Sequence, residues 1–424
     1  MTSRERILET LDHKKTDRTA IDLGATNAIG ISAMVYSRLK KLLGITAGEI
    51  KVVDIIQQLA ELETPVLDAL GCDAVMLRKL APSMGIPIKG YKPGFLSDGT
   101  PCLQAETYNP EMNENGELVF YKITDGSDRV HPYPADNPGF DRGKVVSKMP
   151  KGSHAFTRIY HPLERVETIE ELNRFVFPEI DEEELDFQKE EARHLYEDAD
   201  RAVVGIFHGQ VFEYGQLYWG YQTFFENMAA EPDFVTHFFK RRTEALLRDL
   251  EKYLAAVGQY IQIINFFDDL GAQTSMLISP AMYRGMIKPF HAQLFGFIKS
   301  HYPGIKIFLH SCGAVYDVIP DLMEIGVDIL NPVQITAAGM DPARLKKEFG
   351  KKLVFWGGGV DTQTTLNRGS VEDVRRQVRE MLDIFTPGGG YVFSQVHNIE
   401  ANVPAENVLA AFTAAKNYIL SYRR

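Results

Sequence analysis

The tripeptide His310-Ser311-Cys312 combines residue types and a spacing that favour a metal site. Its first residue ends an apolar run, Lys306–His310, that is typical of a buried strand. Residues i and i+2 of an extended chain point to the same side, so the imidazole and the thiol can converge on one ion. Both groups are good Zn²⁺ ligands, and a catalytic zinc takes three protein ligands and leaves one position open. We predict His397 as the third ligand. The structural alternative is a packed strand end in which His310 is hydrogen-bonded to a carbonyl.

Two further groups of residues are predicted to act beside this metal. Asp268 and Asp269 follow another apolar run and are expected to supply a proton or to orient a substrate. A helix cap or an ion pair with an arginine is the structural alternative for this pair. Six residues that follow predicted strands are expected to contact substrate: His208, Glu213, Tyr214, Trp219, Asn331 and Gln334. For Trp219, packing in the core or in a lid is the alternative.

The elements that must position these residues are eight apolar runs between longer amphipathic segments. The runs are Ala20–Leu23, Ala74–Leu77, Ala202–Phe207, Ile261–Phe267, Lys306–His310, Val327–Leu330, Leu353–Trp356 and Gly390–Phe393. Helical spacing of apolar residues marks Pro280–Lys299, Val315–Ile325 and Val371–Ile384 between the later runs. The alternation predicts the α/β class and a (β/α)8 TIM barrel, with a doubly wound sheet as the alternative. In a barrel, the chemistry gathers at the carboxyl ends of the strands, where the residues named above lie.

One stretch, residues 81–170, breaks this alternation. It is rich in Gly, Pro, Asn and Asp, and it contains the turn-forming dipeptides Asp98-Gly99, Asn115-Gly116 and Asp125-Gly126. Short strands such as Glu117–Ile123 lie between them. We therefore predict a single barrel domain over residues 1–424 that includes a β-rich insertion and linker after the second strand. The insertion is expected to form part of a lid or a subunit contact. An acidic helix over Glu179–Ala199 is expected to lead back into the barrel.

The composition excludes several classes of protein. Lys and Arg number 46 against 57 Asp and Glu, which gives a formal net charge of −11. This balance argues against nucleic acid or an anionic membrane as the main partner. The amino-terminal stretch has no apolar core of a signal peptide, and no run approaches a membrane span, so we expect a cytoplasmic protein. A homodimer is one assembly that the sequence allows. Three scattered cysteines do not suggest a disulfide framework.

Several segments in order resemble the uroporphyrinogen decarboxylase superfamily. They are RERILETLDHKKTDRTAIDLGAT, HSCG with IPDLMEIGVDILNPVQ, GGGVDTQTTL, and PGGGYVFSQVHNIEANVPAENV. The resemblance covers nearly the whole chain and implies a (β/α)8 barrel. The true decarboxylases open their first strand with an arginine-bearing motif, whereas Ala20–Thr26 has no arginine. Their aspartate after the second strand falls near Arg78-Lys79, and only His397 matches a decarboxylase active-site position. The resemblance therefore argues against decarboxylation of a porphyrinogen.

The other branch of the superfamily comprises zinc- and corrinoid-dependent methyltransferases, such as methylcobamide methyltransferases and the methyltransferase components of O-demethylases. Their metal motif is a His-x-Cys followed by a later Cys. His310 and Cys312 match its first part, and the P-x-E-N run Pro404–Asn407 aligns the later Cys with His397. A His/Cys/His set is less negative than His/Cys/Cys, which favours a Lewis-acid role towards oxygen.

The resemblance to this branch implies a methyltransferase with a Zn²⁺ cofactor. It would move a methyl group between a small methylated molecule and the cobalt of a corrinoid (cobalamin). The first hypothesis for the small molecule is an aryl methyl ether, which would make the reaction an O-demethylation. The chain has no D-x-H-x-x-G motif of its own, so the corrinoid is expected on a separate partner protein. Two alternatives remain. One is a metal-independent decarboxylase or lyase acting on a small carboxylate through His397 and Asp268 or Asp269. The other is a non-catalytic barrel that binds a corrinoid protein.

Overall fold

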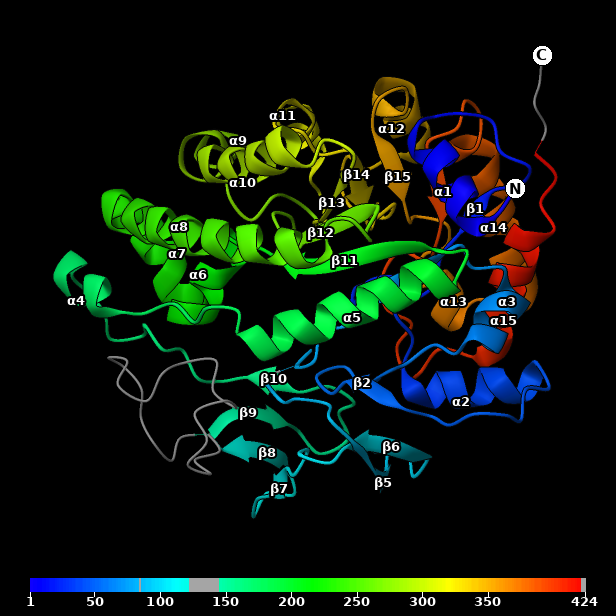
Figure 1. Cartoon of the computed structure of the whole chain (residues 1–424), viewed down its shortest axis with the longest axis horizontal. Coiled ribbons are helices and arrows are strands. Elements are labelled where there is room, and N and C mark those ends of the chain that lie inside the picture. Colours follow the sequence, from blue (N-terminus) through cyan, green and yellow to red (C-terminus); the bar gives the residue numbers. More distant parts are fainter. Residues whose placement is uncertain (84, 122–144, 421–424) are drawn as a thin grey trace.

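Eight parallel strands form the central sheet of the protein (Figure 1). The computed structural model describes residues 1–83, 85–121 and 145–420. In chain order the strands of this sheet are β1 (Ala20–Ile21), β4 (Ala74–Leu77), β11 (Ala202–His208), β12 (Ile263–Phe267), β13 (Lys306–His310), β14 (Ile329–Asn331), β15 (Val354–Trp356) and β16 (Tyr391–Phe393). Each of them overlaps one of the predicted runs. Their order in space is β1-β16-β15-β14-β13-β12-β11-β4, so the predicted (β/α)8 barrel is confirmed and the doubly wound sheet is excluded.

The barrel is nearly closed where β1 approaches β4, and Asp73 links the two strands. Its backbone N–H donates to the carbonyl of Ile21 at 2.7 Å, and its carboxylate accepts the N–H of Ile21 at 3.0 Å. The same carboxylate, which is fully buried, accepts hydrogen bonds from the guanidinium groups of Arg6 and Arg18 at 2.6 to 2.8 Å. A buried carboxylate with two cationic partners therefore joins the first strand to the second.

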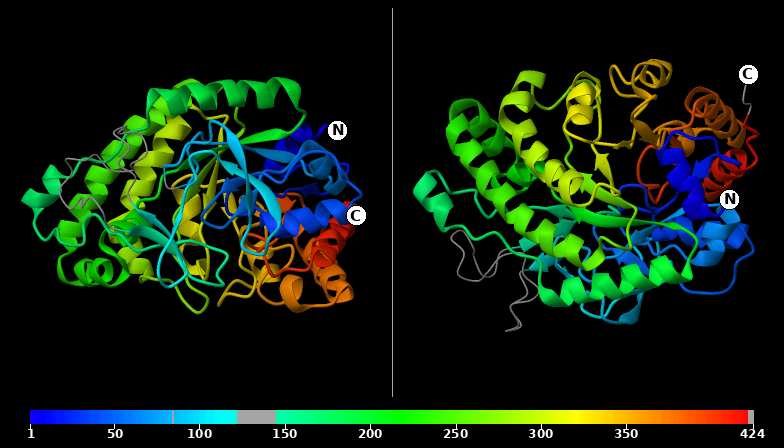
Figure 2. Two further views of the ribbon diagram at one scale, coloured as in Figure 1. Left: turned by 90° about the horizontal axis from the view of Figure 1, so that it is seen from below. Right: turned by 45° about the horizontal axis from the view of Figure 1, so that its top comes forward.

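Helices surround the sheet (Figures 1 and 2). They are α1 (Ser3–Leu11), α2 (Ala33–Leu42), α3 (Thr64–Leu70), α4 (Ile169–Arg174), α5 (Glu182–Asp198), α6 (Phe212–Trp219), α7 (Tyr221–Ala230), α8 (Pro232–Val257), α9 (Pro280–Met282), the π-helix η2 (Tyr283–Ile287), α10 (Lys288–His301), the 3₁₀-helix η3 (Tyr316–Val318), α11 (Ile319–Glu324), α12 (Pro342–Phe349), α13 (Thr365–Arg368), α14 (Val371–Phe385) and α15 (Ala405–Lys416). The predicted acidic helix is α5, and it packs against α8 and β11. The predicted segment Pro280–Lys299 is helical throughout, with η2 between α9 and α10. None of the described helices combines the length and the apolar composition that crossing a lipid bilayer requires.

The stretch after β4 is rich in strands, as predicted. It contains the hairpin β5 (Tyr91–Phe95) and β6 (Pro101–Ala105), and the antiparallel sheet of β7 (Glu111–Met112), β8 (Leu118–Tyr121), β9 (Val145–Met149) and β10 (Thr157–Arg158). Asp98-Gly99 connects β5 to β6, and Asn115-Gly116 connects β7 to β8. The Asp125-Gly126 dipeptide and the end of the predicted strand Glu117–Ile123 lie outside the described residues. A further hairpin, β2 (Val52–Asp54) with β3 (Leu59–Ala60), was not predicted and contacts β6.

Side chains of the barrel strands alternate between the barrel interior and the helices. On β13, Phe308 belongs to the interior cluster with Trp356, whereas Ile307 and Leu309 belong to the larger cluster that includes the helices. His310 has the same parity as Phe308, so its imidazole faces the barrel interior at the carboxyl end of the strand. This alternation is what delivers the predicted histidine to the mouth of the barrel.

Candidate metal centre

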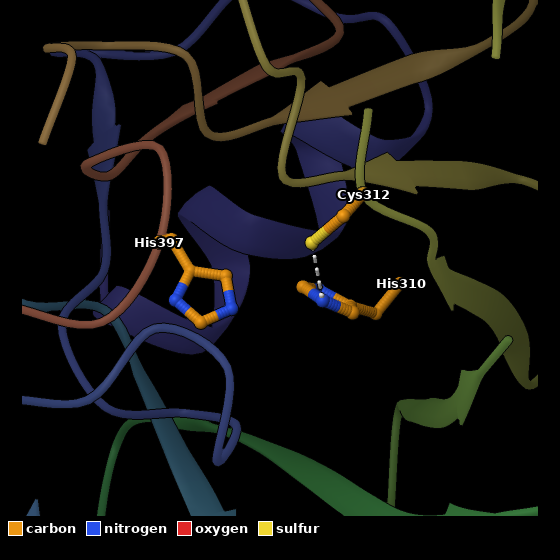
Figure 3. Close-up of side chains that lie close together, drawn as sticks. All are labelled: His310, Cys312 and His397. Atoms are coloured by element: carbon orange, nitrogen blue, oxygen red, sulfur yellow. Dashed lines mark hydrogen bonds between the residues drawn. The ribbon is translucent and has the colours of Figure 1, made fainter. Parts of the chain in front are cut away.

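His310, Cys312 and His397 lie together at the mouth of the barrel, with one ligand atom of each within 4.8 Å of the others. Figure 3 shows the three side chains pointing toward one another. The Cys312 Sγ lies 3.3 Å from the His310 Nε2, and the two imidazole rings are 5.7 Å apart between centroids. His310 ends β13, Cys312 lies in the loop that follows, and His397 lies in the loop after β16. The structure thus brings together the three residues predicted as metal ligands.

The orientation of His310 is fixed by Asn331, which lies beside it on the neighbouring strand β14. The Asn331 Nδ2 donates to the Trp356 carbonyl at 2.7 Å, so its Oδ1 is the atom that faces the His310 Nδ1, at 2.5 Å. An amide oxygen only accepts hydrogen bonds, and therefore the imidazole carries its proton on Nδ1. The lone pair of Nε2 is then directed at Cys312, as a metal ligand requires.

The loop that carries Cys312 packs directly against the loop after β12. Gly313 has a φ of 83°, and a Cβ at this position would meet the backbone of Gly271 at 2.3 Å. Only glycine fits this contact. The close approach places the Asp269 carboxylate 2.8 Å from the Cys312 N–H, which it accepts, and 3.8 Å from the His310 Nε2. The Gln334 Oε1 accepts the N–H of Gly313 at 2.9 Å and holds the same loop from the other side.

The loop that carries His397 is anchored to the opposite wall of the mouth. The Asn398 Oδ1 accepts the N–H of Gly30 at 2.6 Å, and the Gln395 Nε2 donates to the carbonyl of Ile29 at 2.9 Å. Burial, with a smaller contribution from the nearby His310, lowers the pKa of His397 to about 3. His397 is therefore neutral at physiological pH, which is the form that binds a metal.

The two predicted catalytic aspartates occupy different environments. Asp268 is fully buried, and its carboxylate accepts the N–H groups of Val211, Phe212 and Glu213 at 2.7 to 3.0 Å at the start of α6. Its Oδ2 also lies 2.9 Å from the His291 Nε2. The structure therefore corrects the prediction for Asp268, which anchors α6 and does not face the metal cluster. Successive side chains of an extended chain point to opposite sides, so Asp268 and Asp269 could have been expected to face different environments.

Asp269 and Glu213 form an acidic pair beside the cluster. Burial raises the pKa of Glu213 well above its usual range, and the negative charges of Asp269 and Asp268 add to the shift. Burial also raises the pKa of the Cys312 thiol, followed by the charges of Asp269 and Glu213. A cation at the cluster would be attracted by the same charges. The acidic pair therefore fits a site that holds a positive ion next to a proton-carrying carboxyl group.

The remaining predicted substrate residues divide into three groups. Trp219 is buried between Phe234 and Phe238, and its indole N–H donates to the carbonyl of Val166 at 3.2 Å, so the structure corrects the prediction and places it in the core. Asn331 is also fully buried and supports His310 instead of facing a ligand. Substrate contact remains a prediction for the other four residues, His208, Glu213, Tyr214 and Gln334. Of these, His208 and Tyr214 line a separate cavity.

The three ligands fit a zinc ion. Bonds of about 2.0–2.3 Å at tetrahedral angles place ligand atoms roughly 3.3–3.8 Å apart. The Cys312–His310 pair already has this spacing at 3.3 Å, and all three atoms lie within 4.8 Å, so a small inward movement completes the set. Neutral imidazoles and one thiol, with Asn331 behind one ring, are the donor chemistry of a three-ligand zinc site with an open position.

Comparisons with known proteins agree with the architecture. The sequence matches the family described as Uroporphyrinogen decarboxylase (URO-D) over residues 149–418, well over half of the chain. No curated protein matches the sequence. Among solved structures, the chain resembles a B12-independent methionine synthase from Shewanella sp. W3-18-1 at 12% identity and a TM-score of 0.29. The match covers 54% of this chain and 64% of the synthase, which is less than two thirds of the synthase's length. An alpha-amylase from Geobacillus thermoleovorans is similar at 12% identity and a TM-score of 0.32, over 63% and 65% of the two chains. Likeness at this level carries no statement about activity.

Proposed function

This chain belongs to the uroporphyrinogen decarboxylase family of enzymes, and from that premise we propose that it is a zinc-dependent methyltransferase. In this proposal it moves a methyl group between a small methylated molecule and the cobalt of a corrinoid carried by a separate protein. The observation that carries the proposal is the convergence of His310, Cys312 and His397 at the barrel mouth. A metal-independent acid–base decarboxylase would leave this thiol, 3.3 Å from an imidazole nitrogen, without a chemical role.

The residues of the site divide the work. His310, Cys312 and His397 would hold zinc, which supplies a Lewis acid that polarises the methylated heteroatom. Asp269 holds the Cys312 loop through the backbone N–H. Glu213, whose raised pKa keeps a proton on its carboxyl group, donates that proton to the departing heteroatom. In this direction the methyl–heteroatom bond would break, and the heteroatom would keep its electron pair and gain the proton. The electron pair of the new bond to methyl would come from Co(I) of the partner's corrinoid, which would become methyl-Co(III).

The first substrate to test is an aryl methyl ether. Two imidazoles and one thiolate form a harder ligand set than one imidazole and two thiolates, and a harder site suits an oxygen leaving group. Trp219, which is a core residue, gives this choice no support. In this proposal the corrinoid comes on a separate protein, because the sequence has no D-x-H-x-x-G motif of its own.

Metal analysis and a spectral assay test the proposal together. We expect about one zinc per chain in the purified protein, and its loss in Cys312→Ser. Cys102→Ser is the matched control, because Cys102 is a buried thiol in the β5–β6 hairpin, outside the cluster. Methyl transfer from a panel of methyl ethers, methylamines and methyl thiols to cobalamin is followed by the change in the cobalamin spectrum. Loss of transfer in Cys312→Ser but not in Cys102→Ser is the expected result.

Two outcomes contradict the proposal. A metal-free protein that is fully active excludes the role of zinc. A zinc-loaded protein that transfers methyl groups from no member of the panel, to free cobalamin or to a corrinoid protein, excludes the reaction.

A further inference from the structure

A cavity that is separate from the metal cluster lies at the carboxyl ends of β4 and β11. Its volume is about 270 Å³, far above the roughly 10–15 Å³ that a single water needs. The walls come from the end of β11 and from helices α5, α6 and α8, and Figure 1 shows α5 and α8 on either side of β11. The polar residues of these walls include Lys79, Gln188, His208, Tyr214 and Arg242. We call this space the polar cavity.

The polar cavity contains two cations without a carboxylate partner. Within the described part of the chain, no carboxylate oxygen lies within 4.0 Å of the Lys79 ammonium or the Arg242 guanidinium, and no hydrogen bond of Lys79 is present. Arg242 is only 5% exposed, and its guanidinium stacks on Tyr214 at 3.8 Å and makes one long hydrogen bond of 3.4 Å, to the carbonyl of Gln210. Burial lowers the pKa of Lys79, and the charges of Glu184 and Asp249 offset this shift only in part. A buried guanidinium and a half-buried ammonium without direct carboxylate partners are costly unless a ligand compensates them.

The acidic residues of the same cavity are engaged elsewhere. The Glu184 carboxylate accepts the backbone N–H groups of Leu80 and Ala81 at 3.0 and 3.1 Å. Asp249 accepts the N–H of Ile180 at 3.2 Å, and Glu179 pairs with lysine and arginine on the exposed side of α8. Their charges interact with Lys79 and Arg242 only at longer range. The cations therefore remain the groups that are free to contact a ligand.

Unpartnered polar atoms complete the cavity. Gln188 is fully buried, and neither atom of its side-chain amide has a hydrogen-bond partner in the described part of the chain. The His208 Nε2 and the Tyr253 hydroxyl, which also line the cavity, are likewise without partners there. His208 has a φ of 72°, a left-handed conformation that side chains other than glycine rarely adopt. Buried polar atoms without hydrogen-bond partners are uncommon in native proteins, and an ordered water, an ion or a bound ligand can satisfy them.

We propose that the polar cavity binds an oxyanion group. The favoured ligand is the carboxylate of the methylated substrate. Lys79 and Arg242 supply the charge, and the Gln188 amide, the Tyr253 hydroxyl and His208 supply further hydrogen bonds. Phe267 contacts both a wall residue of this cavity and a residue of the metal cluster: its ring lies 5.0 Å from the His208 ring and 5.1 Å from the His310 ring, between centroids. The two sites are therefore close enough that one molecule of aromatic size could contact both. This inference rests on the proposed function for the identity of the ligand, but not for the existence of the site.

Equilibrium binding to the metal-free protein tests the oxyanion site without relying on activity. Benzoate and inorganic phosphate are titrated separately by calorimetry into the wild type, Lys79→Met and Arg242→Gln. Benzyl alcohol, which has no charge, is the ligand control. Lys240→Met is the protein control, because Lys240 lies on the same helix as Arg242 but is exposed and does not line the cavity. We expect benzoate to bind, benzyl alcohol not to bind, and the dissociation constant to rise at least tenfold in both cavity variants but not in the control.

The melting temperature separates a binding role from a structural one. Because Lys79 is a half-buried cation with no carboxylate oxygen within 4.0 Å in the described part of the chain, Lys79→Met should melt at the same or a higher temperature than the wild type while it loses the ligand. If the wild type binds phosphate but not benzoate, and both cavity variants bind phosphate more weakly, the oxyanion site is supported and its ligand is a phosphate group. Absence of binding by both anions, or binding that the two cavity variants leave unchanged, would overturn the proposal. Failure of methyl transfer with anion binding intact would count against the proposed function alone.

Discussion

Asn331 offers the sharpest test of how the metal centre is built, because it touches His310 but cannot be a metal ligand itself. It is fully buried, with its Oδ1 2.5 Å from the His310 Nδ1 and its Nδ2 2.7 Å from the Trp356 carbonyl. In Asn331→Leu, a side chain of similar size removes both hydrogen bonds. The imidazole is then free to carry its proton on either nitrogen, and the lone pair of Nε2 is no longer directed at the cluster.

The two broken contacts predict two separate effects. Removing a hydrogen-bond partner behind a metal-bound histidine lowers metal affinity by about 10- to 100-fold, which corresponds to about 1.4 to 2.7 kcal/mol. Leaving the buried Trp356 carbonyl without a donor costs about 1–3 kcal/mol of folding stability. Asn331→Asp is the matched control, because its carboxylate still accepts the His310 Nδ1–H but has no donor for Trp356. Both variants should therefore lose stability, and only Asn331→Leu should lose zinc affinity.

The assay measures zinc affinity by competition with a chromogenic chelator and stability by urea unfolding of the metal-free protein. We expect a 10- to 100-fold weaker affinity for Asn331→Leu and wild-type or tighter affinity for Asn331→Asp. Equal zinc affinity in the wild type and Asn331→Leu would refute the argument that Asn331 sets the tautomer. Equal losses in the two variants would refute it as well, because disruption of the fold would then explain both.

Three further predictions concern the parts of the structure that hold the site. Asp73→Ala leaves Arg6 and Arg18 without their buried partner and should lower the free energy of unfolding by about 3–5 kcal/mol in urea titrations, whereas an unchanged midpoint would show that the barrel closes without it. Asp268→Ala should lower the free energy of unfolding by about 2–4 kcal/mol, because the variant leaves the first N–H groups of α6 without an acceptor. Its zinc content should be unchanged, and loss of zinc at wild-type stability would contradict the anchoring role. The hydrogen bond from Arg6 lowers the pKa of the half-exposed Asp17 to about 2, so its contribution is complete above about pH 4 and is lost as the pH falls to about 2. Asp17→Asn should lose less stability than the wild type over this range, and identical acid unfolding curves would contradict the assignment.

The barrel was predictable because its strands are buried on both faces and stand out as continuous apolar runs. The ligand triad was predictable for a related reason. His310 and Cys312 share a parity on an extended chain, and a residue that follows the last strand must return to the same rim as every other strand end. The position of His397 at the rim could therefore be predicted from barrel closure alone, without knowledge of how the helices pack.

The residues around the triad were less predictable, because their roles depend on packing between elements. His208 ends β11 and Trp219 follows it, but the direction of α6 turns the Trp219 indole into the core. Lys79 lies two residues beyond β4, and the residues selected at the strand ends did not include it. Arg242 lies in the middle of the long helix α8, and its spacing in the sequence gives no signal that it reaches a cavity at the mouth.

Phe267 turns two separate observations into one constraint on the substrate. Its ring lies about 5 Å from both His208 and His310, so the two imidazoles are at most about 10 Å apart between centroids. The residue is also partly buried against the barrel interior, which fixes its place between the sites. A methylated molecule that uses both sites must therefore hold its oxyanion and its methylated heteroatom on opposite ends of a short spacer that crosses this ring. A rigid aromatic spacer satisfies this at a low entropic cost, whereas a flexible chain of the same length loses rotational freedom on binding. If the proposed function and the oxyanion site both hold, this geometry predicts that methoxylated aromatic acids are better substrates than neutral aryl ethers, without any contribution from Trp219.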